Sequence, residues 1–266
     1  MKITYIGHAT LLLEVGGVRI MTDPNFETTL GRFLPRVSAP GIRFDDLPAL
    51  DALLLTHAHA DHLSFKTLRR LPRQIPLYAP GAIAGWLQRK GHTNAVPLDP
   101  GYVATVGEAR IHAEMATHQG SRYGFDRWRS AANMYVIESE TESIFFAGDT
   151  ALTDTTHHLV QRVLWEKGRR LDVALLPIGY APSWKPGFRR GHLTSEDALA
   201  LFETLRARAM VPYHWGTFRH VTATAHDAIN RLRMRLDGFA GREHVHIAEP
   251  GESLLVSEDT CQIARG

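Results

Sequence analysis

The stretch THAHADH at positions 56–62 constrains this chain more than any other part of it. It places three imidazoles and one carboxylate within six positions, directly after an apolar run at 52–55 that predicts a buried strand. Alternate residues of an extended chain share a face, so His57 and His59 can bind one ion together. Asp61 and His62 lie past the bend and can face a second ion. A surface loop rich in histidine is the alternative, but ordinary packing does not call for this density of metal-binding side chains.

Three more candidate ligands each follow a predicted strand. The runs at 111–115, 144–147 and 209–213 lead to His118, Asp149 and His214 respectively. Side chains at strand ends are held by a sheet and can converge on one site. A single histidine or aspartate in such a place would usually cap an element or lie at the surface. Its recurrence after a metal-binding motif instead favours a shared metal centre.

The remaining pattern alternates strands with helices. The predicted strands are 2–6, 10–15, 18–22, 52–55, 77–79, 95–98, 102–106, 109–115, 134–138, 143–147, 173–177, 209–213, 245–248 and 253–257. Helices are predicted at 64–70, 155–166, 195–208 with Ser195 as N-cap, and 225–236, and long loops at 25–44 and 180–191. We find no repeat and no linker, so we predict one α/β domain over residues 1–266, and the order of elements is compatible with two sheets packed face to face and helices outside.

Composition narrows the class of protein. The formal net charge is +2 and the pI is about 8.8, which favours an anionic substrate without implying nucleic acid. Cys261 is the single cysteine, so no internal disulfide can form and the candidate ligands offer only nitrogen and oxygen. The sequence shows no signal peptide and no apolar stretch of membrane-spanning length. A cytoplasmic enzyme is therefore the expectation.

The order and spacing of these candidates resemble the full ligand set of the metallo-β-lactamase superfamily, and the resemblance runs from residue 5 to residue 247. Finer motifs are similar to the branch that contains N-acyl-phosphatidylethanolamine phospholipase D and L-ascorbate-6-phosphate lactonase. These motifs are GHAT at 7–10, MTDP at 21–24, FFAGDT at 145–150, PIG at 177–179 and HWGTF at 214–218. The resemblance implies a four-layer αββα sandwich with metals along one edge between the sheets.

The resemblance also implies how two ions are held. One ion takes His57, His59 and His118, the other takes Asp61, His62 and His214, and Asp149 bridges them. Such ions lie about 3.5–4 Å apart, and an anionic bridge offsets their repulsion. A bridging hydroxide is the expected nucleophile, and Asp61 would also orient it. Zinc is the favoured metal because imidazoles dominate the set, with manganese or iron as alternatives.

Three further residues are expected to assist the metal centre. Asp23 can accept a hydrogen bond from a ligand imidazole, although an aspartate before Pro24 can equally form a turn. His8 ends the first predicted strand and is expected near the metals, with a packed core histidine as the alternative. His192 matches a histidine that the phospholipase-like branch places near its metals, where it could stabilise a developing anion or protonate the leaving group. A solvated histidine at a helix entry is the alternative.

Four residues are candidates for binding substrate. The guanidinium groups of Arg122 and Arg129 suit phosphate or carboxylate, with ordinary surface charge as the alternative. Tyr180 and Trp184 could form an apolar lid, with ordinary loop packing as the alternative. The expected substrate is a small-molecule or lipid-like anion.

We therefore predict a dinuclear metal-dependent hydrolase that cleaves a phosphodiester, in the manner of a phospholipase D. A lactonase acting on a sugar-phosphate lactone is the first alternative. An apolar groove beside the metals would favour the lipid-like phosphodiester, and a small polar pocket would favour the lactone. A nuclease is another alternative, but we see no basic stripe to hold RNA. A non-catalytic metal-binding scaffold is the last, and the complete ligand set argues against it.

Overall fold

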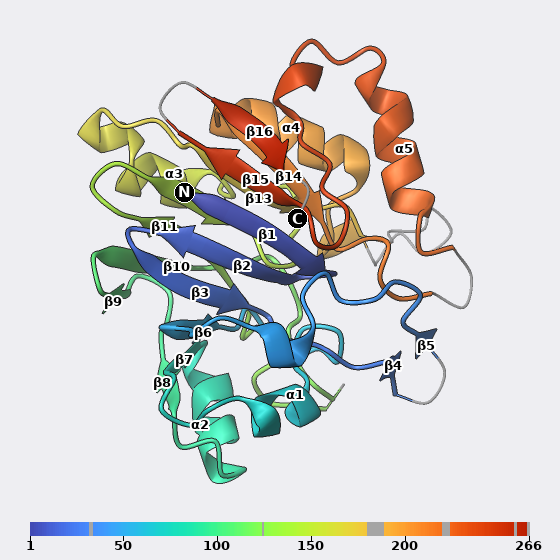
Figure 1. Ribbon diagram of the computed structural model, residues 1–266. Helices are drawn as coiled ribbons and strands as arrows, with labels where there is room; N and C mark the ends of the chain where they lie inside the picture. Colours follow the sequence, from blue (N-terminus) through green and yellow to red (C-terminus); the bar gives the residue numbers. More distant parts are fainter. Residues whose placement is uncertain (32–33, 124, 180–188, 220–223, 258–259, 265–266) are drawn as a thin grey trace.

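Two mixed β-sheets form the centre of the computed structural model, which describes residues 1–31, 34–123, 125–179, 189–219, 224–257 and 260–264 (Figure 1). In these ranges the first sheet has eight strands in the order β16-β15-β1-β2-β3-β6-β7-β8. Its strands are β1 (Lys2–Gly7), β2 (Thr10–Val15), β3 (Val18–Thr22), β6 (Ala52–Leu54), β7 (Leu77–Ala79), β8 (Ala95–Pro97), β15 (Ser253–Val256) and β16 (Cys261–Ala264). Strands β3, β6, β7 and β8 run parallel, whereas β1, β2 and β3 form an antiparallel meander.

The second sheet follows the order β14-β13-β12-β11-β10-β9. It consists of β9 (Val103–Val106), β10 (Ala109–Met115), β11 (Asn133–Glu138), β12 (Ser143–Phe146), β13 (Val173–Pro177) and β14 (Ala209–Tyr213). The pairing is antiparallel from β9 to β12 and parallel from β12 to β14. The carboxyl ends of β12, β13 and β14 therefore share one edge of this sheet.

Helices cover the outer face of each sheet. On the first sheet, α1 (Phe65–Arg70) and α2 (Gly81–Arg89) share a buried apolar cluster with β2, β3, β6 and β7. On the second, α3 (His158–Val163), α4 (Ser195–Leu205) and α5 (Asp227–Leu236) join the other cluster (Figure 1). The layers thus follow the order helix, sheet, sheet, helix, which confirms the predicted αββα sandwich.

The side-chain pattern of β2 explains why both faces of the first sheet are covered. Leu11 and Leu13 belong to the cluster between the sheets, whereas Leu12 belongs to the cluster under α1 and α2. Successive side chains of a strand point to opposite faces, so a strand buried on both faces needs a continuous apolar run. At the end of β2, Gly16 and Gly17 have φ values of 55° and 73°, which are the left-handed angles of a tight two-residue hairpin.

Several predicted elements differ from the structure. The strand predicted at 245–248 is wrong: only Val245 forms a bridge, to Met210, because the chain then turns through residues 250–251 into β15. The helix predicted at 155–166 is a shorter α3 followed by the 3-10 turn η2 (Trp165–Lys167). Thr194, rather than Ser195, caps α4, since its hydroxyl accepts a hydrogen bond from the Asp197 amide and the Asp197 carboxylate bonds back.

Other elements of the structure lie outside the predicted set. They are α2, β16, the short hairpin of β4 (Thr29–Leu30) and β5 (Leu34–Pro35), and the 3-10 turns η1 (Phe44–Asp46) and η4 (Arg242–His244). The hairpin lies within a stretch predicted as loop, and its far end is tied to residues after β14 by a hydrogen bond from the Val37 amide to the Thr217 carbonyl, 2.8 Å long. Within the described ranges, no helix combines the length and apolarity needed to span a bilayer.

Candidate metal centre

Each predicted ligand lies just beyond the carboxyl end of a strand. The 57–62 stretch connects β6 to α1, and Ser64 ends it by capping α1 through a 3.0 Å hydrogen bond from the Thr67 amide. His118 follows β10, Asp149 follows β12 and His214 follows β14. The structure therefore brings ligands from both sheets to the edge between them.

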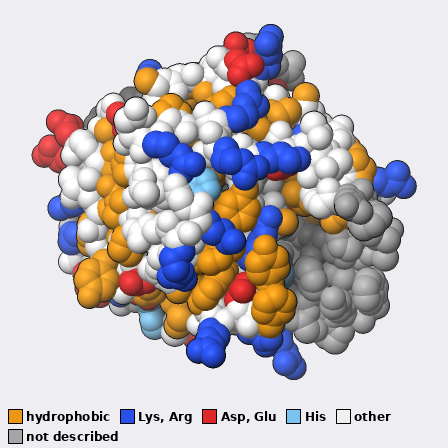
Figure 2. Space-filling model, turned by 90° about the horizontal axis from the view of Figure 1, so that it is seen from below, with side chains coloured by type: hydrophobic (Ala, Val, Ile, Leu, Met, Phe, Trp, Pro, Cys, Tyr) orange, Lys and Arg blue, Asp and Glu red, His pale blue; other side chains and the backbone are white. Residues whose placement is uncertain are grey.

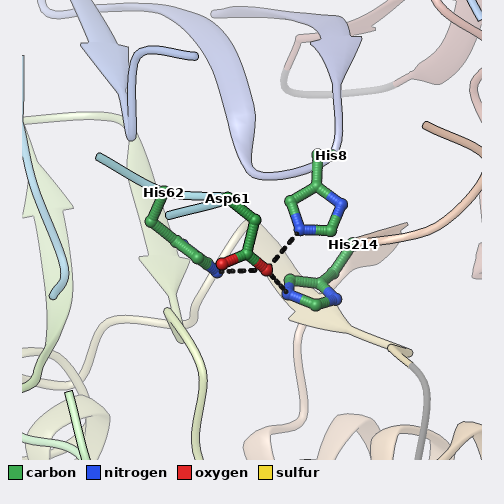
Figure 3. Close-up of side chains that lie close together, drawn as sticks. All are labelled: His8, Asp61, His62 and His214. Carbon is green, nitrogen blue, oxygen red and sulfur yellow. Dashed lines mark hydrogen bonds and ion pairs between the residues drawn. The ribbon is translucent and has the colours of Figure 1, made fainter. Parts of the chain in front are cut away.

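The ligand atoms form two clusters. Within each, one donor atom per residue lies within 4.8 Å of the others, and the members are His57, His59, His118 and Asp149 in the first, and His8, Asp61, His62 and His214 in the second. In the first cluster, His59 Nδ1 lies 3.0 Å from His57 Nε2 and 3.1 Å from His118 Nε2. In the second, the Asp61 carboxylate faces the other three imidazoles (Figure 3).

Asp149 occupies the position between the clusters. Its Oδ2 atom lies 3.4 Å from Nε2 of both His62 and His214, which belong to the second cluster. The same oxygen lies 3.9 Å from His57 Nε2 and 4.0 Å from His118 Nε2 in the first. One carboxylate oxygen is thus within 4.0 Å of histidines from both clusters, which is the position that a bridging ligand requires.

Buried polar atoms without hydrogen-bond partners indicate whether ions fit this site. Among the described residues, Nε2 of His62, Nε2 of His214 and Oδ1 of Asp149 are buried without a hydrogen-bond partner. Buried polar atoms are nearly always paired, so orphans that converge indicate a missing partner. Imidazole nitrogen and carboxylate oxygen are ligands for zinc, manganese and iron. The donor set therefore fits two divalent ions, one in each cluster.

The protonation states of the two clusters differ. Burial lowers the pKa of His118 to about 3 and that of His57 well below its ordinary value, so both are neutral and ready to bind metal. Burial would also lower the pKa of His214, but the carboxylates of Asp149 and Asp61 outweigh it and raise the pKa to about 9. Burial opposes protonation of His62 too, yet Asp149, Asp61 and Asp23 raise its pKa well above the ordinary value.

We expect this difference to separate the two ions by pH. In the metal-free protein His214 binds a proton below pH 9, and an ion must displace it, whereas His118 with a pKa of about 3 presents no such competition. Affinity at the second cluster should therefore fall as pH drops from 8.5 to 6, by about tenfold per unit for one competing proton. Competition with a chromophoric chelator measures both affinities. Equal weakening of the two ions would contradict the assignment.

Contacts behind the ligands hold them in place. The Asp23 carboxylate accepts hydrogen bonds from the Thr56 amide and hydroxyl, each 2.7 Å long, and lies 2.7 Å from His62 Nδ1. His8 Nε2 donates to Asp61 Oδ2 at 2.9 Å, and His118 Nδ1 donates to the Gly191 carbonyl at 2.7 Å. Such partners fix the orientation of ligand side chains. Two of the three residues predicted to assist the centre, Asp23 and His8, therefore make direct contacts with predicted ligands.

Strained backbone also gathers at the centre. In the described part of the chain four residues other than glycine have positive φ, and three of them are His8 at 57°, Asp23 at 32° and His214 at 69°. Such angles cost about 1–3 kcal/mol each and persist where the surrounding structure holds them. The His214 amide donates to the His8 carbonyl at 3.0 Å, which joins the loop after β1 to the loop after β14. Two of the strained residues are thereby tied to each other across the two sheets.

The comparisons with known proteins agree with this geometry. A family model described as a beta-lactamase superfamily domain matches residues 18–215, which include every predicted ligand. The chain belongs to the metallo-β-lactamase superfamily. Family membership and the two clusters together agree with the predicted metal-dependent hydrolase.

The chain is also similar to individual proteins over most of its length. It is similar to N-acyl-phosphatidylethanolamine-hydrolyzing phospholipase D 1 of Caenorhabditis elegans, with 28% identity over 81% of this chain, and spans only 64% of that relative. It is 29% identical to a UPF0173 metal-dependent hydrolase of Flavobacterium johnsoniae, over 87% of this chain and 92% of the relative. The solved structure of a metallo hydrolase from the archaeon Ignicoccus hospitalis matches with a TM-score of 0.68 and 25% identity, covering 95% of this chain and 96% of that one.

A cavity of about 1140 Å³ lies beside the two clusters of predicted metal ligands. One part of its wall is apolar, and it comes from the β4–β5 hairpin, the segment after β14 and the start of α5, with Leu30, Leu34, Trp215, Phe218, Ala225 and Ala228. Another part is cationic, with Arg122, Arg190 and Arg219. His192 also lines the cavity, with Nε2 3.5 Å from Asp149 Oδ2 and its ring against His118.

The predicted substrate-binding residues have different positions. Arg122 lines the cavity, but its guanidinium also donates to the Leu63 carbonyl at 2.8 Å and to the Ala58 carbonyl at 3.3 Å, so it supports the metal-binding loop. Arg129 is exposed and does not belong to the cavity wall. Tyr180 and Trp184 lie outside the described residues.

Glycines outside the predicted ligand set also shape the centre. A Cβ atom on Gly179 would overlap the His214 imidazole, and one on Gly120 would come within 2.6 Å of the His57 Cβ. Gly179 belongs to the PIG motif, so the sequence marks it as a residue of interest. Its role depends on His214, which lies 35 positions further along the chain. Thr56 and the Gly191 carbonyl also support ligands, through hydrogen bonds to Asp23 and His118 that form only in the folded chain.

We expect Gly179→Ala to displace His214 and so to weaken the ion of the second cluster by about 10–100-fold, the usual effect of disturbing groups that position a ligand. Equilibrium dialysis at pH 8 measures this affinity. Gly85→Ala is the matched control, because Gly85 lies within α2 and its added methyl would meet only Arg89 Nη1, at 3.5 Å. Wild-type affinity in Gly179→Ala would show that the imidazole tolerates a neighbouring side chain.

Proposed function

We propose that this protein hydrolyses a phosphodiester that carries an apolar group, as its relative N-acyl-phosphatidylethanolamine-hydrolyzing phospholipase D 1 is named for doing. The chain matches 64% of that relative, and the identity of 28% extends over 234 residues. The family supports a metal-dependent hydrolase, and the substrate class rests on the cavity.

The size and lining of the cavity carry the proposal. A volume of about 1140 Å³ exceeds the ~300–1,000 Å³ of ordinary small-molecule pockets, so it can hold more than one sugar ring. The apolar wall suits an acyl or alkyl chain, whereas the arginines suit a phosphate. A lactone of a sugar phosphate is small and polar throughout and would leave the apolar wall unused. This combination favours the lipid-like phosphodiester over the lactone.

The molecular surface beside α1 and α2 also combines basic and apolar side chains. Figure 2 shows Lys and Arg side chains gathered there among hydrophobic ones. Exposed contributors are Lys66, Arg69 and Arg70 around α1 and Arg89 and Lys90 at the end of α2. Basic residues mixed with apolar ones attract anionic lipid headgroups, which supports a substrate of this kind.

The residues of the centre supply distinct parts of the reaction. Two divalent ions, when bound, would make water more acidic and stabilise the charge that develops on the phosphate. His8 holds the Asp61 carboxylate by its 2.9 Å hydrogen bond, and Asp23 holds His62. His192 lies 3.5 Å from the Asp149 carboxylate at the cavity wall, where it can donate a proton to the leaving alcohol or a hydrogen bond to the developing anion.

A substrate panel tests the proposal. Purified protein should carry two divalent ions by elemental analysis, zinc foremost. Metal-loaded protein should hydrolyse bis-p-nitrophenyl phosphate and, more efficiently, a phosphodiester with a long acyl chain. Lactones, β-lactams and oligonucleotides are the comparison substrates. Efficient turnover of a lactone or an oligonucleotide, with no turnover of bis-p-nitrophenyl phosphate or of the phosphodiester with a long acyl chain, would reject the proposed substrate class. A protein that binds both ions but hydrolyses none would favour the scaffold alternative.

A further inference from the structure

We propose that Arg190 and Arg219 form an anion-binding subsite of the cavity, so that the substrate carries an anionic group in addition to the bond that is cleaved. The inference rests on the proposed function for the identity of that bond. It assigns specificity to two arginines that the ligand motifs do not include.

Arg190 lies beside the first cluster. It directly precedes Gly191, whose carbonyl accepts the 2.7 Å hydrogen bond from His118 Nδ1, and it comes two residues before His192. Its side chain is exposed and belongs to the cavity wall. Across the ranges that the structure describes, it makes no ion pair and no side-chain hydrogen bond. Its position is fixed by the same short segment that orients a predicted metal ligand.

Arg219 lies beside the second cluster. It follows Phe218, whose ring packs edge-on against His8 with centroids 5.2 Å apart. The Arg219 amide donates to the Pro35 carbonyl at 3.0 Å, which fixes the backbone against the β4–β5 hairpin. The guanidinium is exposed at the cavity wall and, like that of Arg190, has no ion-pair partner in the described residues.

The surrounding charges leave both arginines available to a ligand. The third cavity arginine, Arg122, already donates to two backbone carbonyls. Apart from the metal-cluster carboxylates, the cavity wall in the described ranges has one acid, Asp227, and its oxygens accept hydrogen bonds from the Thr224 amide and hydroxyl. A solvated surface arginine is ordinary, but here two line the same cavity, one beside each metal cluster. Guanidinium forks match phosphate and carboxylate geometry.

A binding experiment tests the subsite without requiring catalysis. Hexylphosphonate and 6-phosphonohexanoate differ only in a distal carboxylate, and calorimetry on protein loaded with zinc gives both dissociation constants. Wild type should bind the carboxylate-bearing ligand about tenfold more tightly, and Arg190→Gln and Arg219→Gln should each remove much of that preference. The double variant should bind both ligands equally. Arg242→Gln, which removes an exposed charge from η4 outside the cavity wall, is the control and should retain the preference.

The outcomes separate the two proposals. A wild type without preference, or a double variant with the full preference, would overturn the subsite even if phosphodiesters are hydrolysed. A preference that both substitutions remove would establish the subsite even if the protein hydrolyses only some other class of substrate. Zinc content measured in each variant must remain at the wild-type level, and a loss of zinc in the double variant would overturn the assignment by showing that the arginines act on the metal centre.

Discussion

Asp149→Asn should retain the fold but lose at least one of the two ions, and hydrolysis of bis-p-nitrophenyl phosphate should fall by about a thousandfold or more. The substitution keeps the shape of the side chain and removes its charge. Oδ2 of Asp149 lies 3.4 Å from histidines of the second cluster and within 4.0 Å of two in the first. Without its charge, repulsion between two dications about 3.5–4 Å apart is no longer offset, and the ions contribute several kcal/mol to catalysis.

Elemental analysis and steady-state kinetics on the same preparation measure both effects. Asp172→Asn is the matched control, since Asp172 is also a buried aspartate but pairs with Arg208 and Ser143, away from the centre. That variant should be less stable to heat and keep both ions. If Asp149→Asn kept full metal occupancy and its turnover, Asp149 would not be the bridging ligand.

His192→Ala should lower kcat by about a hundredfold or more while the metal content stays close to that of the wild type. His192 lies outside the two metal-ligand clusters, yet its Nε2 lies 3.5 Å from Asp149 at the cavity wall. A general acid or base contributes roughly 10²–10⁴-fold, and one donor to a developing anion roughly 10²–10³-fold. Both effects act in the transition state, so KM should change less than kcat.

The best phosphodiester from the substrate panel is the assay for this variant. His158→Ala removes an exposed histidine from α3 and should leave kcat and metal content unchanged. A near-native kcat in His192→Ala would falsify the catalytic assignment and leave His192 as a solvated histidine at the entry to α4. Loss of an ion would instead show that the side chain helps to bind metal.

The ligands could be predicted because the necessary information is local. The motif at 56–62 is dense, and each later candidate comes one to three residues after an apolar strand that could be recognised by itself. Strand ends converge once the sheets pack, so the sequence revealed that the ligands would meet. The topology could not be predicted in this way, because hydrophobic periodicity does not say which strand lies beside which. The αββα order was implied by the family resemblance.

The missed elements depend on contacts between distant residues. Helix α2 begins at Gly81, and the Gly81 amide is held by the Asp99 carboxylate at 2.7 Å, so no capping residue is visible next to it in the sequence. Strand β16 is short and forms by pairing with β15. The contact between Gly179 and His214 likewise exists only in the folded chain.

Substrate contacts also depend on how distant parts of the chain pack together. Arg122 and Arg129 lie seven residues apart, yet one lines the cavity and the other is exposed outside it. Which side of a loop faces a cavity depends on packing, such as the Arg122 contacts to the 58 and 63 carbonyls, and no periodic pattern encodes it. Arg190 and Arg219 were not predicted because nothing in the neighbouring sequence distinguishes them from other surface arginines.

The order in which the protein folds and binds metal follows from how the ligands are divided between the two sheets. The hydrogen bond from the His214 amide to the His8 carbonyl joins the two parts. Residues 8–62 supply five of the eight clustered side chains, and residues 118–214 supply the other three. Neither portion holds a complete cluster, so a nascent chain cannot capture both ions before the sheets dock. Metal loading should then be the last step of biogenesis, and cells short of metal should accumulate an assembled but heat-sensitive protein that later ions can rescue.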